Sequence, residues 1–186
     1  MESLMLNQMY KRLLLVAIVV GPIFWLVFTE DGQRRSDAVL LWLLGKDEMR
    51  INLKALSPAL KKSDIEKVYA NINWQCTTRH SAFGDSLCAA NIGLYNDIPA
   101  KYITLFFADD RLNGLKLEYL SHYHDQILKQ LYLQLGKPEQ NPADKPGGPV
   151  YRWLTEYGMV IAKKKLQEGD EPALLWLPMS MAGVEN

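Results

Sequence analysis

The longest apolar run of the chain lies near its start. Leu13 to Phe28 reads LLLVAIVVGPIFWLVF and contains no charged residue. A spanning helix needs about 20 apolar residues. The flanking residues extend the run to 9–29, because Lys11 and Arg12 can reach the headgroups with their charged ends. The sequence therefore predicts that residues 9–29 cross a lipid bilayer as one helix.

The alternative to a permanent anchor is a cleaved signal peptide. The run is followed by Phe28-Thr29-Glu30-Asp31, which lacks the small-x-small pattern of a cleavage site. Counting Lys and Arg leaves the orientation tied, because Lys11-Arg12 precede the run and Arg34-Arg35 follow it. The short N-terminal tail and the cysteine pair described below favour an N-terminus in the cytoplasm, with the rest of the chain outside it.

A second apolar run, Ala38 to Leu44 (AVLLWLL), is too short to span a bilayer. Ser36 or Asp37 can cap it and Gly45 can end it, which indicates a short helix. Two locations are compatible with this pattern. The helix packs on its own domain, or it lies on the bilayer or against a partner.

The next segments carry weaker patterns. Arg50 to Leu56 alternates apolar and polar positions and could be a short strand. Ser63 with Glu66 forms a capping-box pattern, which predicts a helix from about Asp64 to Asn71. Trp74 to Leu87 has no regular apolar period and is interpreted as a loop.

The second half of the chain alternates in ways typical of strands and one helix. We expect strands at Cys88–Leu94, Lys101–Phe107 and Gly114–Leu120, with Ile98-Pro99 at an edge or strand start and a hairpin turn at Asp109-Asp110-Arg111. A helix begins at Ser121, repeats apolar residues every four positions to Leu135, and ends at Gly136 and Pro138. Three more strands are expected at Val150–Glu156, Met159–Lys164 and Ala173–Leu177.

This order predicts an α+β fold, in which an N-terminal transmembrane helix precedes an antiparallel sheet with helices packed on one face. The expected boundaries are a tail and anchor (1–30), a juxtamembrane helix and connector (31–62), the α+β domain (63–178) and a frayed tail (179–186). Both halves of the domain place a helix before strands, which suggests a duplicated unit, although no fixed-period repeat accompanies it.

Composition narrows the function classes. The 186 residues suffice for one domain with attachments. The 21 Lys and Arg residues balance 21 Asp and Glu residues, so there is no electrostatic case for binding nucleic acid. No phosphate-binding glycine loop or zinc-protease motif occurs, and we expect no cofactor.

Cys76 and Cys88 are the only cysteines. Their spacing closes a short loop, for which a disulfide contributes about 3 kcal/mol in the chain-entropy model. The spacing differs from the Cys-x-x-Cys of redox sites, and a zinc site would need more ligands than nearby His80. We therefore expect a structural disulfide in an oxidising compartment and no metal site.

Four other groups could carry chemistry. His122 and His124 fall in the first turn of a helix, where residues two apart do not share a face, so we expect surface or boundary histidines. Asp109 and Asp110 suit a turn better than a carboxylate pair. The remaining candidates are a hydrolase-like set in the cysteine loop and a lysine run at a strand end: His80, Ser81, Asp85 and Ser86, and Lys163–Lys165.

Several stretches carry a resemblance. They are Trp74-Gln75-Cys76, Gly84 to Ala90, Ile98-Pro99-Ala100 leading to Leu115-Lys116-Leu117, and Leu135-Gly136-Lys137-Pro138. Between Ser63 and Pro138 the chain resembles uncharacterised membrane-anchored proteins of proteobacteria with a small extracytoplasmic α+β domain. Its layout is also similar, topologically, to small lipoproteins of the outer-membrane assembly machinery, although it lacks their lipidated cysteine.

The resemblance implies a location in the inner membrane facing the periplasm, and a binding or scaffolding role rather than catalysis. We accordingly expect a single-pass protein, not an enzyme, whose domain binds a protein partner or envelope component. The alternative is an envelope enzyme with a hydrolase-like site in the Cys76–Cys88 loop. A deep pocket gathering His80 and Asp85 would favour the enzyme, and an exposed apolar patch or sheet edge would favour the binding domain.

Overall fold

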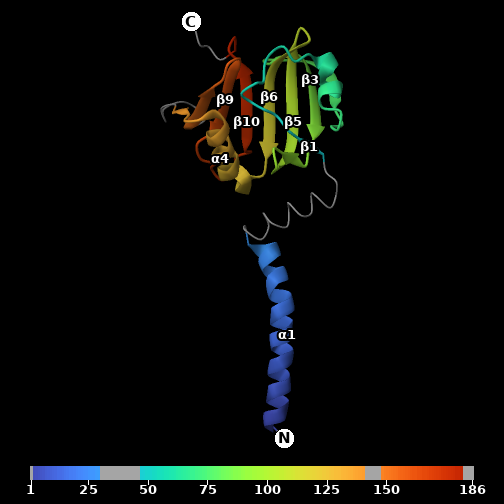
Figure 1. Ribbon diagram of the computed structural model, residues 1–186, viewed down its shortest axis with the longest axis vertical. Helices are drawn as coiled ribbons and strands as arrows, with labels where there is room; N and C mark the ends of the chain where they lie inside the picture. The colour runs from blue at the N-terminus through green and yellow to red at the C-terminus, as the bar shows by residue number, and fades with distance from the viewer. Residues whose placement is uncertain (1, 30–46, 141–147, 182–186) are drawn as a thin grey trace. The chain divides into compact units, whose positions relative to one another are not determined.

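The computed structural model describes residues 2–29, 47–140 and 148–181. They belong to two units, one within Met1–Gly45 and a folded domain within Lys46–Asn186 (Figure 1). The helix predicted at residues 38–44 and most of the predicted tail, residues 182–186, lie outside the described residues.

The N-terminal unit contains helix α1, Glu2–Phe28. At its end, the hydroxyl and the N–H of Thr29 both donate to the Trp25 carbonyl, at 2.6 and 3.1 Å. Apolar side chains along the helix are exposed, Leu13 by 69%. A helix is therefore present where the sequence predicts one. Among the described residues, no helix is both long and apolar enough to cross a membrane.

The folded domain is α+β, with a ten-stranded mixed sheet and few helices. The longer strands follow the order β2-β3-β5-β6-β10-β9-β8 across the sheet. The elements are β1 (Glu48–Met49), η1 (Lys62–Asp64), α3 (Ile65–Val68), β2 (Gln75–Ser81), β3 (Gly84–Asn91), β4 (Leu94–Tyr95), β5 (Ile98–Ala108), β6 (Arg111–Tyr119), η2 (Ser121–Tyr123), α4 (His124–Leu135), β7 (Glu139–Gln140), β8 (Val150–Leu154), β9 (Gly158–Lys163) and β10 (Ala173–Pro178).

The central hairpin forms as the sequence predicts. Strands β5 and β6 pair antiparallel, and Asp109 and Asp110 make the turn with φ of 51° and 63°. Aspartate tolerates this left-handed conformation, and a turn with positive φ at both central residues matches the twist of the flanking strands. Along β6, Leu115, Leu117 and Tyr119 are buried, whereas the residues between them are half-exposed.

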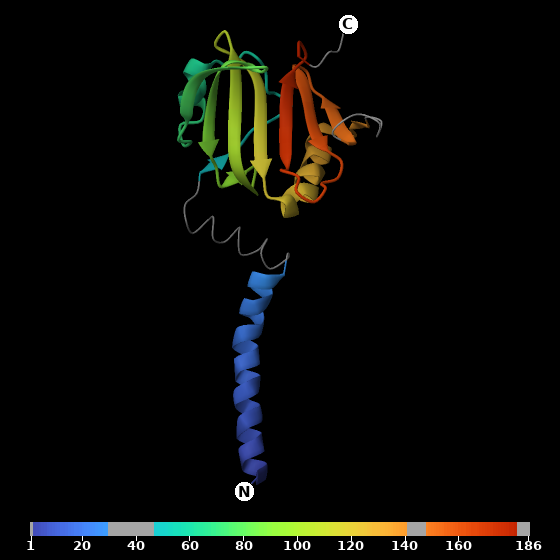
Figure 2. The same cartoon turned by 180° about the vertical axis from the view of Figure 1, so that it is seen from behind.

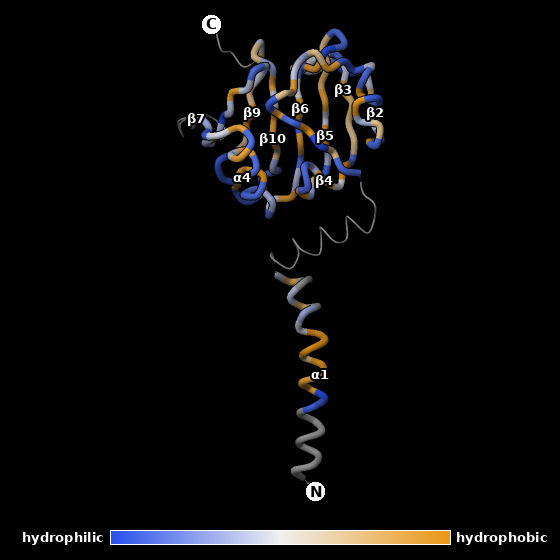
Figure 3. Tube along the Cα trace, in the orientation of Figure 1, coloured by the Kyte–Doolittle hydropathy of each residue, from blue (hydrophilic) through white to orange (hydrophobic). Residues whose placement is uncertain are grey.

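One face of the sheet carries the core. Residues paired from strand to strand form a continuous apolar row across it. In register order the row is Cys88, Leu105, Leu115, Trp176, Val160 and Trp153. Figure 3 shows hydrophobic positions concentrated on these central strands.

Helix α4 lies across this face, in front of β9 and β10 in Figure 1, and buries Ile127, Leu128 and Leu131. Seen from behind, the central strands have no described helix in front of them (Figure 2).

The two halves of the domain share one layout. In each, a helix precedes four strands that pair antiparallel side by side. Helix α3 precedes β2, β3, β5 and β6, with the two-residue β4 between β3 and β5 in the chain, and α4 precedes β7, β8, β9 and β10. The last strands of the halves, β6 and β10, pair antiparallel at the centre, with Leu117 opposite Leu174. The duplication suggested by the sequence is thus present in the topology of the strands.

The predicted strand at Arg50–Leu56 is wrong. Ile51 is buried, as are Leu53 and Leu56, but the segment turns instead of extending, with the Ala55 N–H donating to the Asn52 carbonyl at 3.1 Å. The Asn96 side chain takes the place of a strand partner. Its amide oxygen accepts from the Ile51 N–H, and its amide nitrogen donates to the Ile51 carbonyl, each at 2.9 Å. The folded unit therefore includes residues before Ser63.

Three further expectations need correction. The segment Trp74–Leu87 contains β2 and the start of β3, not a loop. The helix expected over residues 64–71 is one 3-10 turn followed by the four residues of α3. The sheet is not wholly antiparallel, because β1 pairs parallel with β4, across a connection too long for a local pattern to reveal.

Candidate functional site

A disulfide joins Cys76 of β2 to Cys88 of β3, and the two residues lie directly opposite each other in the ladder. The predicted pairing is confirmed, but its setting differs, because the bond links two neighbouring strands instead of tying a loop to a strand. Cys88 is fully buried and Cys76 is exposed. The bond therefore couples the outermost strand of this edge to the core.

The distance between the Cα atoms of Cys76 and Cys88 also indicates which backbone groups of β2 face outward. Opposed antiparallel residues alternate between pairs that exchange two hydrogen bonds, about 5.5 Å apart at Cα, and pairs that exchange none, about 4.5 Å apart. The Cα atoms of Cys76 and Cys88 are 4.0 Å apart, which indicates the second kind. The N–H and C=O groups of Cys76 and Thr78 therefore point away from β3, whereas those of Gln75 and Thr77 point towards it.

Strand β2 forms one edge of the sheet. All seven of its residues are exposed, and within the described residues β3 is its only strand partner. The pairing with β3 is regular from Gln75 to Thr78 and shifts register between Thr78 and Ser81. A bulge of this kind interrupts an edge as a template for another strand. The usable template is therefore the four residues from Gln75 to Thr78.

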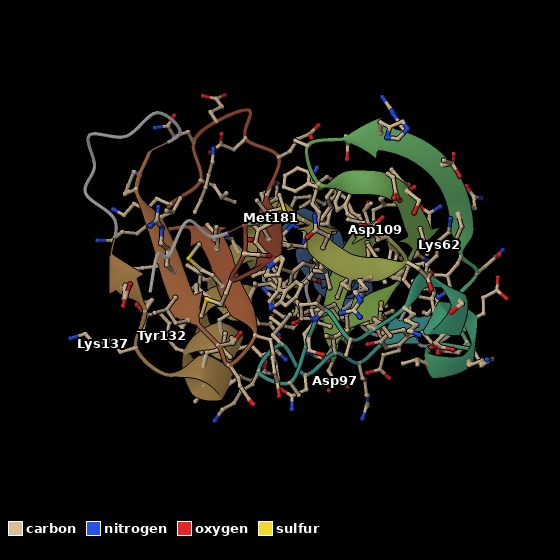
Figure 4. All side chains as sticks on the ribbon, turned by 90° about the horizontal axis from the view of Figure 1, so that it is seen from above. Lys62, Asp97, Asp109, Tyr132, Lys137 and Met181 are labelled. Carbon is tan, nitrogen blue, oxygen red and sulfur yellow. A yellow bond between two sulfur atoms is a disulfide. The ribbon has the colours of Figure 1, made fainter. Side chains whose placement is uncertain are left out.

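A hollow of about 390 Å³ adjoins this template on the side of the sheet that carries the disulfide. Its lining combines one β2 residue with polar and charged groups from η1, α3 and the β5–β6 turn: Cys76, Lys62, Ser63, Glu66 and Asp110. The Lys62 N–H donates to the Asp110 carbonyl at 3.1 Å, which fixes η1 against that turn. Figure 4 shows Lys62 on the same side of the domain as Asp109.

The hydrolase-like residues do not assemble a nucleophilic site. Asp85 accepts a hydrogen bond from the Asp109 N–H at 3.2 Å, and this bond, with one from Ser86, lowers the pKa of Asp85. The Ser81 hydroxyl bonds the Gly84 carbonyl and the Phe83 N–H within its own turn. Ser81 thus supports the β2–β3 turn, and Asp85 ties this hairpin to the β5–β6 turn; the three hollows described for this domain are lined by other residues.

The two helix-start histidines lie at the junction of β6 and α4. His124 is 6% exposed, and its Nδ1 lies 2.9 Å from the Tyr119 hydroxyl. The His122 ring stacks obliquely on Tyr123, with ring centres 4.3 Å apart. In the part of the chain that the structure describes, no three His, Cys, Asp or Glu side chains gather in a way that could hold a metal ion.

The remaining charged candidates have structural partners. Asp109 and Asp110 form the β5–β6 turn described above. Lys163, at the end of β9, contacts the Asp170 carboxylate at 2.6 Å, and Lys164 lies over the Tyr151 ring. Lys163 and Lys164 thus take part in the local structure of this strand end.

Sequence reasoning placed the disulfide but missed the exposed strand that it braces. Strand β2 reads Gln-Cys-Thr-Thr-Arg-His-Ser, which is polar on both faces and so gives no period-2 signal. The signal that could have revealed it is the pair of β-branched threonines beside a cysteine.

No protein-family model, curated protein sequence or solved structure matches this chain. The function is therefore argued from the geometry of the β2 edge and from the N-terminal helix.

Proposed function

We propose that the chain is a single-pass inner-membrane protein whose folded domain faces the periplasm and binds a protein partner or envelope component. The observation that carries the proposal is the exposed edge strand β2, braced to the core by the Cys76–Cys88 disulfide. Backbone groups that face away from the neighbouring strand along an edge are a surface to which an extended segment can add as a further strand.

The proposed anchor is residues 9–29. Its support is the uncharged run from Leu13 to Phe28, which lies wholly within α1, together with the exposure of its apolar side chains, among them Leu15 and Ile18. Water solvates such a surface poorly, so an apolar surrounding is needed to cover it.

The proposed location of the domain is supported by the disulfide. Disulfides persist in oxidising compartments such as the bacterial periplasm and are rare in the cytoplasm. With the residues before the anchor in the cytoplasm, one crossing places the folded domain on the periplasmic side.

Location is tested with reporters fused after Asn186. We expect activity from a reporter that works only outside the cytoplasm, silence from one that works only inside it, and retention of both fusions in membranes after alkaline extraction. A Val19→Arg variant should weaken retention, because a charge at the centre of a spanning helix is costly. Cytoplasmic reporter activity, or release of the wild-type chain by extraction, would contradict the proposal.

Binding is tested by crosslinking in cells with a matched pair of edge variants. Thr78→Pro removes the outward N–H of Thr78, whereas Thr78→Ala removes only its side chain. We expect the crosslinked species of the wild type to persist in Thr78→Ala and to be lost in Thr78→Pro. Equal crosslinking in both variants would remove the edge from the binding surface.

A further inference from the structure

We infer that the β2 edge pairs with β2 of a second copy of this chain, antiparallel, with Thr77 on the two-fold axis. The inference rests on the proposed function, since it names the partner of that same edge. It follows from the backbone groups that face outward, from the side chains that would meet, and from where the regular part of the strand ends.

The outward backbone groups select the register. In an antiparallel ladder, residues that exchange hydrogen bonds both direct their N–H and C=O groups at the partner strand. On β2 these are Cys76 and Thr78, as the 4.0 Å Cα separation of the disulfide indicates. Pairing Cys76 of each copy with Thr78 of the other satisfies both residues on both strands. Thr77 then faces Thr77 of the second copy as a pair without backbone hydrogen bonds, at about 4.5 Å between Cα atoms.

The side chains that meet in this register are compatible. Thr77 meets Thr77 on one face, and threonine pairs across strands are favourable. Gln75 falls opposite position 79, beyond the regular part of the strand, so no charged pair forms within the paired segment. On the other face, Thr78 of the second copy lies opposite Cys76, beside the hollow that Ser63 and Glu66 help to line. A threonine hydroxyl is compatible with the polar and charged groups that line this hollow.

The charge of the edge and the proposed location both suit a second copy. The four template residues, Gln75 to Thr78, are uncharged, so two copies of this segment meet without like charges opposite each other. The proposed anchor would hold copies in one membrane at a raised effective concentration. The shift in register after Thr78 limits the pairing to a short segment, so the contact is weak without the anchor.

The test is disulfide crosslinking of the full chain in native membranes, with Thr77→Cys compared with Gln75→Cys. Both positions are exposed and lie on the same face of β2. Position 77 lies on the two-fold axis, so its Cα atoms in the two copies are close together. Their separation falls within the range of bonded cysteines, about 4.4–6.8 Å. Position 75 of one copy would lie four positions along the strand from position 75 of the other, about 13 Å at the rise of an antiparallel strand. We expect a crosslinked dimer of Thr77→Cys, with the bond mapped by mass spectrometry to position 77 of both copies, and none of Gln75→Cys.

A second variant guards against scrambling with the neighbouring Cys76. Adding Thr78→Pro to Thr77→Cys should abolish the dimer, whereas adding Thr78→Ala should preserve it. Equal crosslinking of Thr77→Cys and Gln75→Cys, or linkage of Thr77→Cys to a different protein, would overturn the inference.

Labelling distinguishes failure of the inference from failure of the proposed function. Suppose that a membrane-impermeant maleimide labels Thr77→Cys in intact spheroplasts and no crosslinked dimer forms. This result would support the periplasmic location and refute the pairing. A Thr77→Cys chain that neither crosslinks nor labels until the membrane is opened overturns both.

Discussion

The Tyr119 hydroxyl lies 2.9 Å from Nδ1 of His124, inside the core where strand β6 leads into helix α4. Burial raises the pKa of the Tyr119 phenol, so the phenol keeps its proton at neutral pH and can donate it to the imidazole. Burial also lowers the pKa of His124 below its ordinary 6.5, an effect opposed by the Asp125 carboxylate and the backbone of Lys163. The junction therefore holds a neutral histidine.

This junction predicts a pH dependence of stability. Because the folded pKa of His124 is depressed, its contribution is fully present above about pH 6.5 and is lost as the pH falls through the folded pKa. Asp85 and Asp170, whose pKa values are lowered from 3.8, lose their contributions only at more acidic pH. The urea concentration at the unfolding midpoint of the wild type should therefore decrease as the pH is lowered from 7.5 to 5.

The matched variant for this prediction is His124→Gln, which keeps a polar side chain but cannot be protonated in this range. We expect it to be less stable than wild type at pH 7.5 and to show a flatter pH profile. An unchanged profile would place the responsible group elsewhere.

The core face of α4 predicts a contrast between two leucines on one helix. Leu131 is 1% exposed and Leu133 is 79% exposed. Leu131→Ala should lower the free energy of unfolding by about 2–5 kcal/mol because it opens a cavity. Leu133→Ala should change it by no more than about 0.5 kcal/mol. Similar losses from both, measured by chemical denaturation, would mean that α4 does not pack as described.

Most elements that the sequence predicted correctly have a pattern that records burial on one face. The β5–β6 hairpin, α4 and β10 bury alternate or every-fourth residues, so local periodicity reveals them. Strand β8 was also predicted, although only Trp153 of its five residues is buried. Phe107 is fully buried and Leu131 nearly so, as the predicted apolar stripe of α4 requires. The disulfide was predictable because the chain holds only two cysteines.

The elements that sequence reasoning missed depend on residues far away in the chain. Ile51 has the pattern of a strand residue, but its backbone N–H and C=O are hydrogen-bonded to the side chain of Asn96, 45 positions further along the chain. Strand β2 is exposed on both faces, so its side chains carry no record of the pairing that forms it. The β6–β10 pairing joins the two halves, and no local pattern specifies which strands meet there.

The end of α4 predicts a backbone effect at Gly136. Its φ of 83° and ψ of −155° fall in a region that only glycine adopts readily, and its carbonyl accepts a 2.9 Å bond from the Trp153 indole. Gly136→Ala should cost about 1–3 kcal/mol from backbone strain, although nothing lies within 4 Å of an added Cβ.

Gly114→Ala is the matched control for this prediction. There the added Cβ would meet its nearest neighbour, the Phe106 side chain, at an ordinary 3.5 Å, and φ is not in the left-handed range. It should be neutral or slightly stabilising. Equal stability of the two variants in thermal unfolding would refute the assignment of strain to Gly136.

The disulfide predicts a response to reductant. Replacing both cysteines, as Cys76→Ala with Cys88→Ala, should lower the stability of the domain by about 3 kcal/mol, because the short loop that the bond closes is no longer restricted in the unfolded chain. The double variant should unfold at the same urea concentration with or without dithiothreitol, whereas the wild type should lose stability in its presence. A wild type insensitive to dithiothreitol would indicate free thiols in the native protein.

Residue-resolved hydrogen exchange along β2 tests the central claim, a free edge whose outward backbone groups receive another strand. In dilute protein, we predict fast exchange of the Cys76 and Thr78 amides and slow exchange of the Thr77 amide, which bonds to β3. At native density in membranes, all three should be protected, and Thr78→Ala should behave in the same way. Protection of Cys76 and Thr78 in dilute protein, or fast exchange of both in membranes, would contradict the claim.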